Sequence, residues 1–508
     1  MNNYYVTTPI YYVNDTPHIG HAYTTIIADT LARWEKIKGN DTYFLTGTDE
    51  HGLKIEQSAK NKGVSPQELV DDVSQSFRDL CLKVDSSPND FIRTTESRHK
   101  EVVKDLWLKL VESGDIYLGE YSGWYSVNDE AYFTEDEIVD GKAPSGHKVE
   151  WLVEKSYFFR LSKYTDLLLN HFDENPDFIQ PKKRLNEVRS FVKQGLKDIS
   201  ISRSTFSWGI EVPEDPEHVI YVWLDALANY ISGLGGFEGS LFEKYWGNSH
   251  HIIGKDILRF HAVYLPCFLL SVGEDLPKKI IAHGWWTAEG EKISKSKGNA
   301  IDPNKVIDAI GSDSFRYFLL REISLGSDGD FSYNSLVSRI NSDLSNEYGN
   351  LVSRTLGLLK KYRASKIPES YELGLDEVEL LKVINSSKSE LELAFDNYRL
   401  NDALKAIWKV VKAGNKYVND TAPWVLYKEG KDKDLDRVLY TLVELLRVIG
   451  IWTSPFLPTS SKKLLDSLGV VNRDFQSSIK WFVLKPNTEI KDSLQLFPRL
   501  NLKPEDIK

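Results

Sequence analysis

The stretch TPIYYVNDTPHIGHAYTTIIAD, residues 8–29, indicates how the first part of the chain folds. It overlaps residues 3–13, NYYVTTPIYYV, whose content of Tyr, Val, Thr and Ile is typical of a buried strand. From His18 to Lys38 apolar residues recur at helical spacing, and DTYFLTGTD at residues 41–49 predicts a second strand. A capped amphipathic helix follows at residues 65–84. Strand, helix and strand in this order predict a parallel sheet with helical crossovers.

Further along the chain the pattern changes twice. Residues 117–213 read as short, turn-rich strands with helical pieces, which predicts an inserted domain. Strand–helix alternation returns afterwards, and helical periodicity then dominates the rest of the chain. We therefore expect an α/β Rossmann-like parallel-sheet domain, residues 1–116 and 214–280, split by this insertion. A linker domain at residues 281–325 and an all-α helical-bundle domain at residues 326–508 follow.

Composition limits the classes of function that fit. The 508 residues carry a formal net charge of −11, so the whole molecule is not a basic nucleic-acid carrier. Residues 181–205 form a local basic segment: they contain seven Lys and Arg and only two acidic residues, Glu187 and Asp198, which gives a net charge of +5. With only Cys81 and Cys267 and no CxxC, the sequence excludes a disulfide framework and fits a reducing compartment. No signal pattern or membrane-spanning apolar stretch is present, so we expect a soluble, cytoplasmic protein.

Two histidines, His18 and His21, lie three residues apart at the predicted helix start and therefore share one face. A helix N-terminus supplies unpaired N–H groups and partial positive charge, which suits a phosphate. Neutral imidazoles at this place can donate further hydrogen bonds to phosphate oxygens. An ordinary surface or core role for both histidines is the alternative.

A second segment, GEKISKSKGNAIDP at residues 290–303, combines Lys292, Lys295 and Lys297 with serines and glycines. Such a loop can close on a leaving pyrophosphate and neutralise the charge that builds up in the transition state. The alternative is a plain solvated lysine loop.

Together, the HIGH and KISKS segments resemble the HIGH and KMSKS motifs of class I aminoacyl-tRNA synthetases, with Ile293 where that family usually has Met. The resemblance implies that an amino acid reacts with ATP to give an aminoacyl-adenylate and pyrophosphate, and is then transferred to tRNA with release of AMP. It implies that His18 and His21 bind the ATP phosphates and that Lys295, assisted by Lys292, stabilises the pyrophosphate. Mg²⁺ is expected from ATP chemistry.

Further segments, from about residue 3 to about residue 460, are similar to those of methionyl-tRNA synthetases. They are PIYYVNDTPHIGH, TGTDEHG, DISISRS, VWLDALANYI, GKDILRFHAVYLP and HGWWTAEGEKISKSKGN. The resemblance implies ligation of L-methionine to tRNA(Met) for translation initiation and elongation. On this resemblance the parallel-sheet domain is catalytic, residues 281–325 carry the KMSKS-type loop, and residues 326–508 bind the anticodon.

The resemblance also assigns binding residues. Those for methionine are Ile10, Tyr12, Asp49, Trp223, Ala226, Tyr230, Ile257 and His261. Apolar and aromatic walls suit a flexible thioether, and a carboxylate at Asp49 suits the substrate ammonium. Gly254 and Asp256 match a ribose-binding pair, and Arg203 matches an arginine near the adenylate; these, with the two histidines and Lys292 and Lys295, are the expected ATP-binding residues.

Two departures from the family pattern stand out. Many relatives carry a zinc-binding knuckle in the insertion, but here the four matching positions have no cysteine. These positions are Ser126, Asp129, Ala143 and Gly146. Four-coordinate zinc needs thiolates or imidazoles, and His147 alone does not suffice, so we expect no structural zinc. In addition, Leu265 stands where many relatives have Trp at the methionine pocket.

In the helical half, Asn350 and Arg354 lie four residues apart on one helix face, and Trp424 follows an Ala-Pro pair. Amide and guanidinium groups can bind base edges, and an exposed aromatic can stack on an unpaired base. The resemblance implies that these residues read a CAU anticodon; a capping or ion-pair role for Asn350 and Arg354 is the alternative. The chain has no room for the added β-barrel domain of some relatives, so we expect a monomer.

Three competing functions fit the sequence less well. Class I ligases for leucine, isoleucine or valine usually carry a larger editing insertion, and the cysteine enzyme needs zinc thiolates. A small-molecule nucleotidyltransferase shares the HxGH element but has no use for the helical half. An RNA-binding paralogue without activity could have lost any of His18, His21, Asp49, Lys292 or Lys295, all of which are present.

Overall fold

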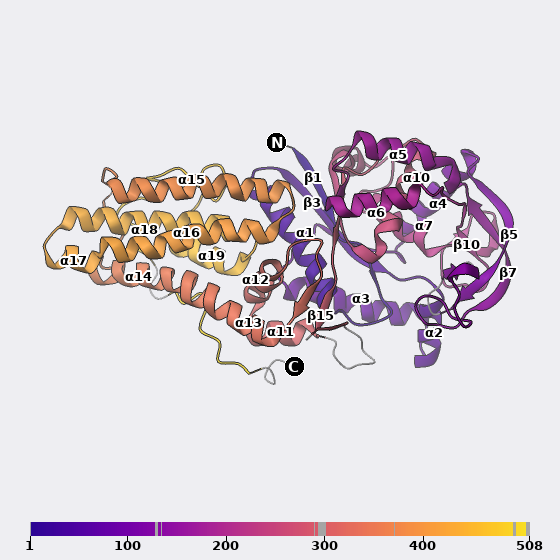
Figure 1. The fold of residues 1–508 in the computed structure, drawn as a ribbon, viewed down its shortest axis with the longest axis horizontal. Helices are drawn as coiled ribbons and strands as arrows, with labels where there is room; N and C mark the ends of the chain where they lie inside the picture. Colours follow the sequence, from indigo (N-terminus) through magenta and orange to yellow (C-terminus); the bar gives the residue numbers. More distant parts are fainter. Residues whose placement is uncertain are drawn as a thin grey trace.

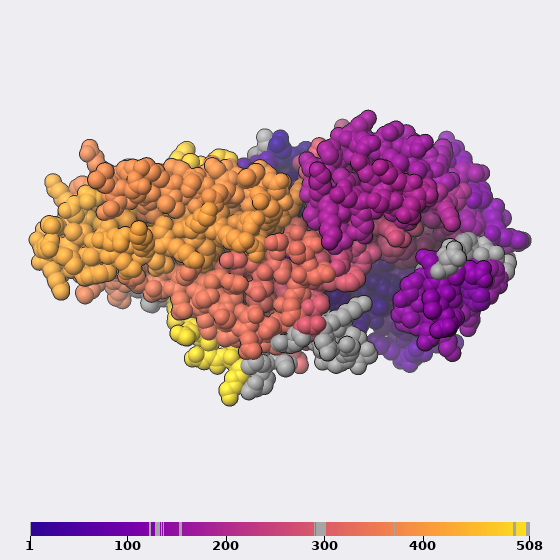
Figure 2. All heavy atoms as spheres, viewed as in Figure 1, coloured from indigo at the N-terminus to yellow at the C-terminus, as the bar shows by residue number. Residues whose placement is uncertain are grey.

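The computed structural model places an α/β half and a helical half end to end in one elongated molecule (Figure 1). The described residues are 2–127, 131–133, 135–288, 290–292, 301–369, 371–490 and 494–503. In the space-filling view the surface is hollowed between the purple inserted strands and the salmon segment, with indigo N-terminal residues at the base (Figure 2).

A parallel sheet forms the centre of the α/β half, as the sequence predicts. Its strands, in spatial order, are β2 (Tyr11–Tyr12), β3 (Asp41–Asp49), β1 (Asn3–Thr7), β13 (Ser249–Gly254), β14 (Lys279–His283) and β8 (Ile179–Gln180), and β4 (Asp90–Arg93) also pairs with β3. All of these pairings are parallel. The single strand expected over residues 3–13 is wrong in one respect, because it breaks into β1 and β2 around Pro9, which has no N–H to donate to a neighbouring strand.

Helices cover this sheet as crossovers. They are α1 (Ile19–Ile37), α2 (Leu53–Lys62), α3 (Pro66–Lys83), α4 (Ser97–Glu112), α7 (Val222–Leu227), α8 (Asn229–Ser232), α9 (Ser240–Tyr245) and α10 (Leu265–Val272). The cap expected for α3 is present: Ser65 and Glu68 satisfy each other's backbone N–H groups. Strand β1 lies between β3 and β13 in the sheet. The chain connections on its two sides therefore run toward opposite edges of the sheet. Crevices at such a point, beyond the carboxyl ends of the strands, are where ligands bind in open α/β sheets.

The inserted segment builds a separate antiparallel sheet. Its strands are β5 (Ile116–Ser126), β6 (Ala131–Phe133), β7 (Glu150–Phe159) and β9 (Ile199–Ser200), followed by the small sheet of β10 (Ser202–Arg203), β11 (Glu211–Val212) and β12 (Asp215–Ile220). Helices α5 (Thr165–Glu174) and α6 (Lys182–Val192) lie between them in sequence. Strand β8, also from this part of the chain, joins the central sheet beside β14, so the insertion is anchored to the main fold.

A small sheet of β15 (Trp286–Ala288), β16 (Glu291–Lys292) and β17 (Gly329–Phe331) lies at the start of the helical half, whose first two helices come between β16 and β17 in the sequence. Its helices are α11 (Pro303–Ile310), α12 (Ser312–Glu322), α13 (Tyr333–Arg339), α14 (Asn350–Arg363), α15 (Leu375–Asp396), α16 (Leu400–Thr421), α17 (Pro423–Lys428), α18 (Asp432–Thr453) and α19 (Pro458–Ser467), with a π-helical turn at Ile340–Gly349. This confirms the predicted bundle. No helix in the described part of the chain is long and apolar enough to cross a membrane.

Arg316 of α12 ties the two halves together. It is fully buried and forms an ion pair with Asp29 of α1 at 2.7 Å. Its guanidinium also donates to the carbonyl oxygens of Val84, Pro455 and Phe456 at 2.9–3.0 Å. A buried guanidinium needs this many acceptors, so the two halves pack as one unit.

Candidate active site

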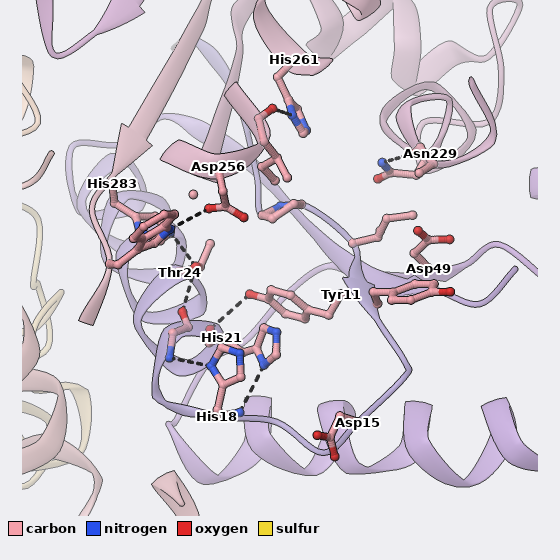
Figure 3. Close-up of a pocket in the computed structure, with 18 of the residues that line it drawn as sticks. Tyr11, Asp15, His18, His21, Thr24, Asp49, Asn229, Asp256, His261 and His283 are labelled. Carbon is pink, nitrogen blue, oxygen red and sulfur yellow. Dashed lines mark hydrogen bonds between the residues drawn. The ribbon is translucent and has the colours of Figure 1, made fainter. Parts of the chain in front are cut away.

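A cavity of about 650 Å³ opens beyond the carboxyl ends of β1, β3 and β13, where the switch in connections predicts a ligand site. Its lining includes twelve of the residues expected to bind ATP or methionine. They are Ile10, Tyr12, His18, His21, Asp49, Trp223, Ala226, Tyr230, Gly254, Asp256, Ile257 and His261. In the close-up, His18 and His21 lie at one side of the cavity and Asp49 and Asn229 at the other (Figure 3).

The two histidines together cap helix α1. The backbone N–H of Gly20 donates to Nδ1 of His18 at 3.0 Å, and the backbone N–H of His18 donates to Nδ1 of His21 at 3.2 Å (Figure 3). The rings stack with their centroids 3.8 Å apart. Because each Nδ1 accepts a hydrogen bond, a neutral ring carries its proton on Nε2 and can donate from there. Burial, and then the neighbouring His18, hold the pKa of His21 well below its usual value, so His21 is neutral.

The glycine between these histidines leaves space for the capping ring of His18. A Cβ at Gly20 would lie 2.9 Å from Cε1 of His18, inside contact distance. A side chain there would displace the capping ring, so the sequence His-Ile-Gly-His fits its geometry. The helix N-terminus and the two Nε2–H groups then form a set of donors suited to a polyphosphate.

The side of the cavity around Asp256 contains groups that the sequence pattern did not point to. Nε1 of Trp285 donates to Asp256 at 3.0 Å, and Thr24 of α1 contacts Nε2 of His283 at 2.7 Å. A Cβ at Gly254 would lie 2.5 Å from Oδ1 of Asp256, so the lack of a side chain at Gly254 leaves space for this carboxylate. His283 and Trp285 belong to the quoted HGWW segment, but their partners lie far away in the sequence.

At the opposite end, the cavity has aromatic walls. The hydroxyl of Tyr230 donates to Nε2 of His261 at 2.6 Å, and Nδ1 of His261 donates to the carbonyl of Ile257 at 3.0 Å. Burial lowers the pKa of His261 to about 4, so the ring is neutral. Trp223 stacks on Phe260 with ring centroids 3.3 Å apart. A neutral imidazole, a hydroxyl and flat apolar faces form a pocket for an uncharged, polarizable chain.

Asp49, at the end of β3, places a buried carboxylate at this end of the cavity, 8% exposed. Behind it lies a buried cluster in which Asp225 of α7 contacts Nδ1 of His51 and Nε2 of His99, both at 2.7 Å. Burial alone would raise the pKa of Asp225, but the imidazoles of His51 and His99 lower it to about 2. The cluster joins the loop after Asp49 to the helix that carries Trp223 and thereby fixes the pocket walls.

Some expected site residues lie elsewhere. Arg203 is not among the residues that line the cavity. Its guanidinium lies 3.9 Å from the ring centre of Tyr221, which is a lining residue. Nη1 of Arg203 donates to the carbonyl of Ser202 at 2.7 Å. Lys292 ends strand β16, and Lys295 lies outside the described residues. Leu265 is buried in α10 and does not line the cavity.

The positions that match the zinc knuckle lie in and near the inserted sheet. Ser126 ends β5, Ala143 is buried, and Asp129 lies outside the described residues. Across the described ranges, no group of three or more His, Cys, Asp or Glu side chains could hold a metal ion. The predicted absence of zinc stays a prediction.

The expected RNA-binding residues all lie in the helical half. Asn350 and Arg354 are both on α14, and Arg354 donates to Oδ1 of Asn419 near the end of α16 at 2.8 Å. Trp424 lies on α17, which begins two residues after α16 ends, and it is 37% exposed. An exposed tryptophan suits stacking on an unpaired base.

Comparison with known proteins identifies relatives along the whole chain. Residues 4–151 and 143–356 match the family of tRNA synthetases class I (M), and residues 367–499 match the anticodon binding domain of methionyl tRNA ligase. The methionine–tRNA ligase of Rickettsia conorii is 51% identical, covering 98% of this chain and 100% of the relative. That of Caldanaerobacter subterraneus subsp. tengcongensis is 48% identical, covering 99% and 80%. A structure of Mycobacterium tuberculosis methionyl-tRNA synthetase in complex with methionyl-adenylate superposes with a TM-score of 0.95 at 45% identity, covering 98% of this chain and 100% of the other.

Proposed function

The chain belongs to the methionyl-tRNA ligases, class I tRNA synthetases, and from this membership we propose a role for each part of its cavity. The enzyme uses ATP to join L-methionine to tRNA(Met) through methionyl-adenylate. A carboxylate oxygen of methionine attacks the α-phosphorus of ATP, and the bond to the β-phosphate breaks with release of pyrophosphate. A ribose hydroxyl of tRNA then attacks the carbonyl carbon, and AMP leaves.

The observation that carries the assignment is the meeting of two unlike sites in one cavity. At one end the N-terminus of α1 and Nε2–H of His18 and His21 would bind the phosphates and stabilise the charge that moves onto pyrophosphate. At the other end Asp49 would bind the methionine ammonium, while Tyr230 and His261 face the side chain. Catalysis is then mainly positioning and electrostatics.

The remaining ATP contacts follow from the same geometry. Asp256, held by Trp285, would accept from the ribose hydroxyls, and Gly254 leaves room for the sugar. Lys292 and Lys295 would bind the pyrophosphate. Arg203, packed on Tyr221 behind the cavity wall, would act through that ring. Mg²⁺ needs no full set of protein ligands here, because it binds nucleotides largely through their phosphate oxygens and water. It would neutralise charge on the ATP phosphates.

Recognition of the tRNA would come from the helical half, with Trp424 stacking on an anticodon base and Asn350 and Arg354 binding base edges. The test is aminoacylation of tRNA(Met) and of a transcript with an altered anticodon. Trp424→Ala should raise the KM for tRNA(Met) about tenfold, as loss of one stacked base costs about 1–3 kcal/mol, and should leave methionine activation unchanged. Equal charging of both tRNAs by the parent enzyme would contradict anticodon reading.

We further propose that the enzyme works as a cytoplasmic monomer. Both cysteines, Cys81 and Cys267, are buried free thiols, which suits a reducing compartment. Sedimentation equilibrium at micromolar concentration should give one mass of about 58 kDa, the mass of the chain. A stable dimer would contradict the proposal.

A further inference from the structure

Two aspartates, Asp328 and Asp330, stand on either side of Gly329, the first residue of strand β17. This strand pairs in parallel with β15, and Asp330 lies beside Thr287. Thr287 and the residues just before it, from Trp285 on, line the cavity on the side around Asp256. Neither Asp328 nor Asp330 is among the lining residues, so each can act on a ligand only through residues that are.

Asp328 fixes the residues that surround the Asp256 carboxylate. It accepts from the backbone N–H of Trp285 at 2.8 Å and from Nζ of Lys255 at 2.6 Å. Nζ of Lys255 also lies 4.1 Å from the ring centre of Trp285, close enough for a cation–π contact. The Trp285 indole in turn donates to Asp256 at 3.0 Å, and Lys255 and Asp256 are adjacent in the short helical turn Lys255–Ile257. The hydrogen bond from Lys255 lowers the pKa of Asp328, so its charge is present at neutral pH.

Asp330 fixes the other end of β15. Its Oδ1 accepts from the hydroxyl of Thr287 at 2.6 Å and from the backbone N–H of Gly290 at 2.7 Å. Gly290 has a φ of +79°, a conformation that favours glycine, and it forms the turn between β15 and β16. These two strands are antiparallel, with Thr287 beside Lys292. The carboxylate of Asp330 therefore fixes the turn that precedes Lys292.

The backbones of the two segments pack too closely for the aspartates to shift independently. The N–H of Gly329 donates to the carbonyl of Trp285 at 2.8 Å. A Cβ at Gly284 would lie 2.1 Å from the carbonyl oxygen of Ser327, and one at Gly329 would lie 2.6 Å from Cγ2 of Ile323. Because the segments touch along their backbones, each aspartate is held at a fixed distance from the residues it contacts.

We propose that Asp328 and Asp330 are positioning residues for methionine activation, Asp328 orienting Asp256 toward the ribose of ATP and Asp330 placing Lys292 toward the pyrophosphate. The proposal rests on the proposed function, because it takes the roles of Asp256 and Lys292 from it. The two aspartates then affect different kinetic constants. A ribose contact is made in bound ATP and in the transition state alike, so weakening it raises KM. Charge on the pyrophosphate builds up in the transition state, so a displaced lysine lowers kcat.

The experiment is methionine-dependent pyrophosphate exchange by the full-length enzyme with ATP titrated. Asp328→Ala should raise the KM for ATP about fivefold and leave kcat within about twofold of the parent. Asp330→Ala should do the reverse, lowering kcat about tenfold with the KM for ATP within about twofold. Asp330→Asn keeps an oxygen that can accept from Thr287 and Gly290 and should recover the kcat of the parent. Asp466→Ala, which removes a partly exposed aspartate of α19 paired with Lys462 and Arg473, is the matched control and should change none of these.

Lys255→Met and urea unfolding separate positioning from a general structural role. Lys255→Met should raise the KM for ATP as Asp328→Ala does, and the double variant should raise it no further, because the two side chains act as one pair. Asp328 and Asp330 are exposed, so the alanine variants should keep the urea midpoint of the parent. Losses of kcat that follow a lowered midpoint, or an Asp330→Asn as slow as Asp330→Ala, would overturn the proposal.

Two reference variants distinguish failure of this proposal from failure of the proposed function. Asp256→Asn should raise the KM for ATP, and Lys292→Ala should lower kcat. If both do so while Asp328→Ala and Asp330→Ala match the parent, the positioning proposal is wrong and the proposed function stands. If the reference variants themselves match the parent, the proposed roles of Asp256 and Lys292 are wrong and the positioning proposal is wrong with them.

Discussion

Replacing Asp49 by asparagine tests the methionine end of the active site. The substitution keeps the shape of the side chain and removes the charge that is proposed to hold the substrate ammonium. Asp49 is only 8% exposed, so water screens such a contact weakly. Removing one partner of a buried, hydrogen-bonded charge pair costs about 2–5 kcal/mol, or about 30- to 4,000-fold in binding. We expect kcat/KM for methionine to fall at least about 100-fold, a value within that range.

The assay is methionine-dependent pyrophosphate exchange with methionine and ATP titrated separately. Asp49→Asn should raise the KM for methionine and leave that for ATP within about twofold of the parent. Asp256→Asn makes the same chemical change across the cavity and should do the reverse, raising the KM for ATP. A loss below threefold in Asp49→Asn, or equal shifts of both KM values in both variants, would refute the assignment of the two ends.

Three further perturbations test the geometry. Gly254→Ala places a Cβ 2.5 Å from Oδ1 of Asp256 and should raise the KM for ATP about tenfold in the exchange assay, on the order of 1.4 kcal/mol, with the methionine KM unchanged. Burial lowers the pKa of His261 to about 4, so between pH 6.5 and 4 the unfolded chain binds a proton that the folded chain does not. This group therefore contributes its full stabilisation above pH 6.5. On acidification, the free energy of unfolding measured with urea should fall by on the order of 3 kcal/mol more in the parent than in His261→Gln. Arg316→Met leaves Asp29 with one fewer partner and should reduce the free energy of unfolding by about 3–5 kcal/mol. An unchanged urea midpoint would contradict the role of Arg316 between the two halves.

Local sequence patterns determine much of this fold. Strand β3 has the predicted bounds, and the Ser65–Glu68 cap lies where spacing placed it, because strand alternation and helix capping depend on neighbouring residues. The expected strand over residues 3–13 breaks at Pro9, where the lost N–H outweighs the β-forming neighbours. The expected pairing of His18 with His21 at the helix start is present in the structure.

Contacts that join distant segments could not be predicted in this way. The contact between Thr24 and His283 and the hydrogen bond from Asn341 to the Leu500 carbonyl each join segments far apart in the sequence. The tail at residues 494–503 forms no helix or strand; apolar side chains that pack on the helical core and hydrogen bonds from Asn341 and Ser345 to its backbone hold it in place. Arg203 packs on the ring of Tyr221 and does not line the cavity, a placement that a strand of two residues does not reveal in the sequence.

The most direct test of the account is exchange of pyrophosphate into ATP by the purified enzyme with each of the twenty amino acids, with magnesium as the only added metal. We expect exchange with methionine alone. Exchange with another amino acid would retain the ATP chemistry at His18 and His21 and contradict the pocket built from Asp49, Tyr230 and His261. Exchange with none would contradict the assigned activity, unless added tRNA(Met) restored it.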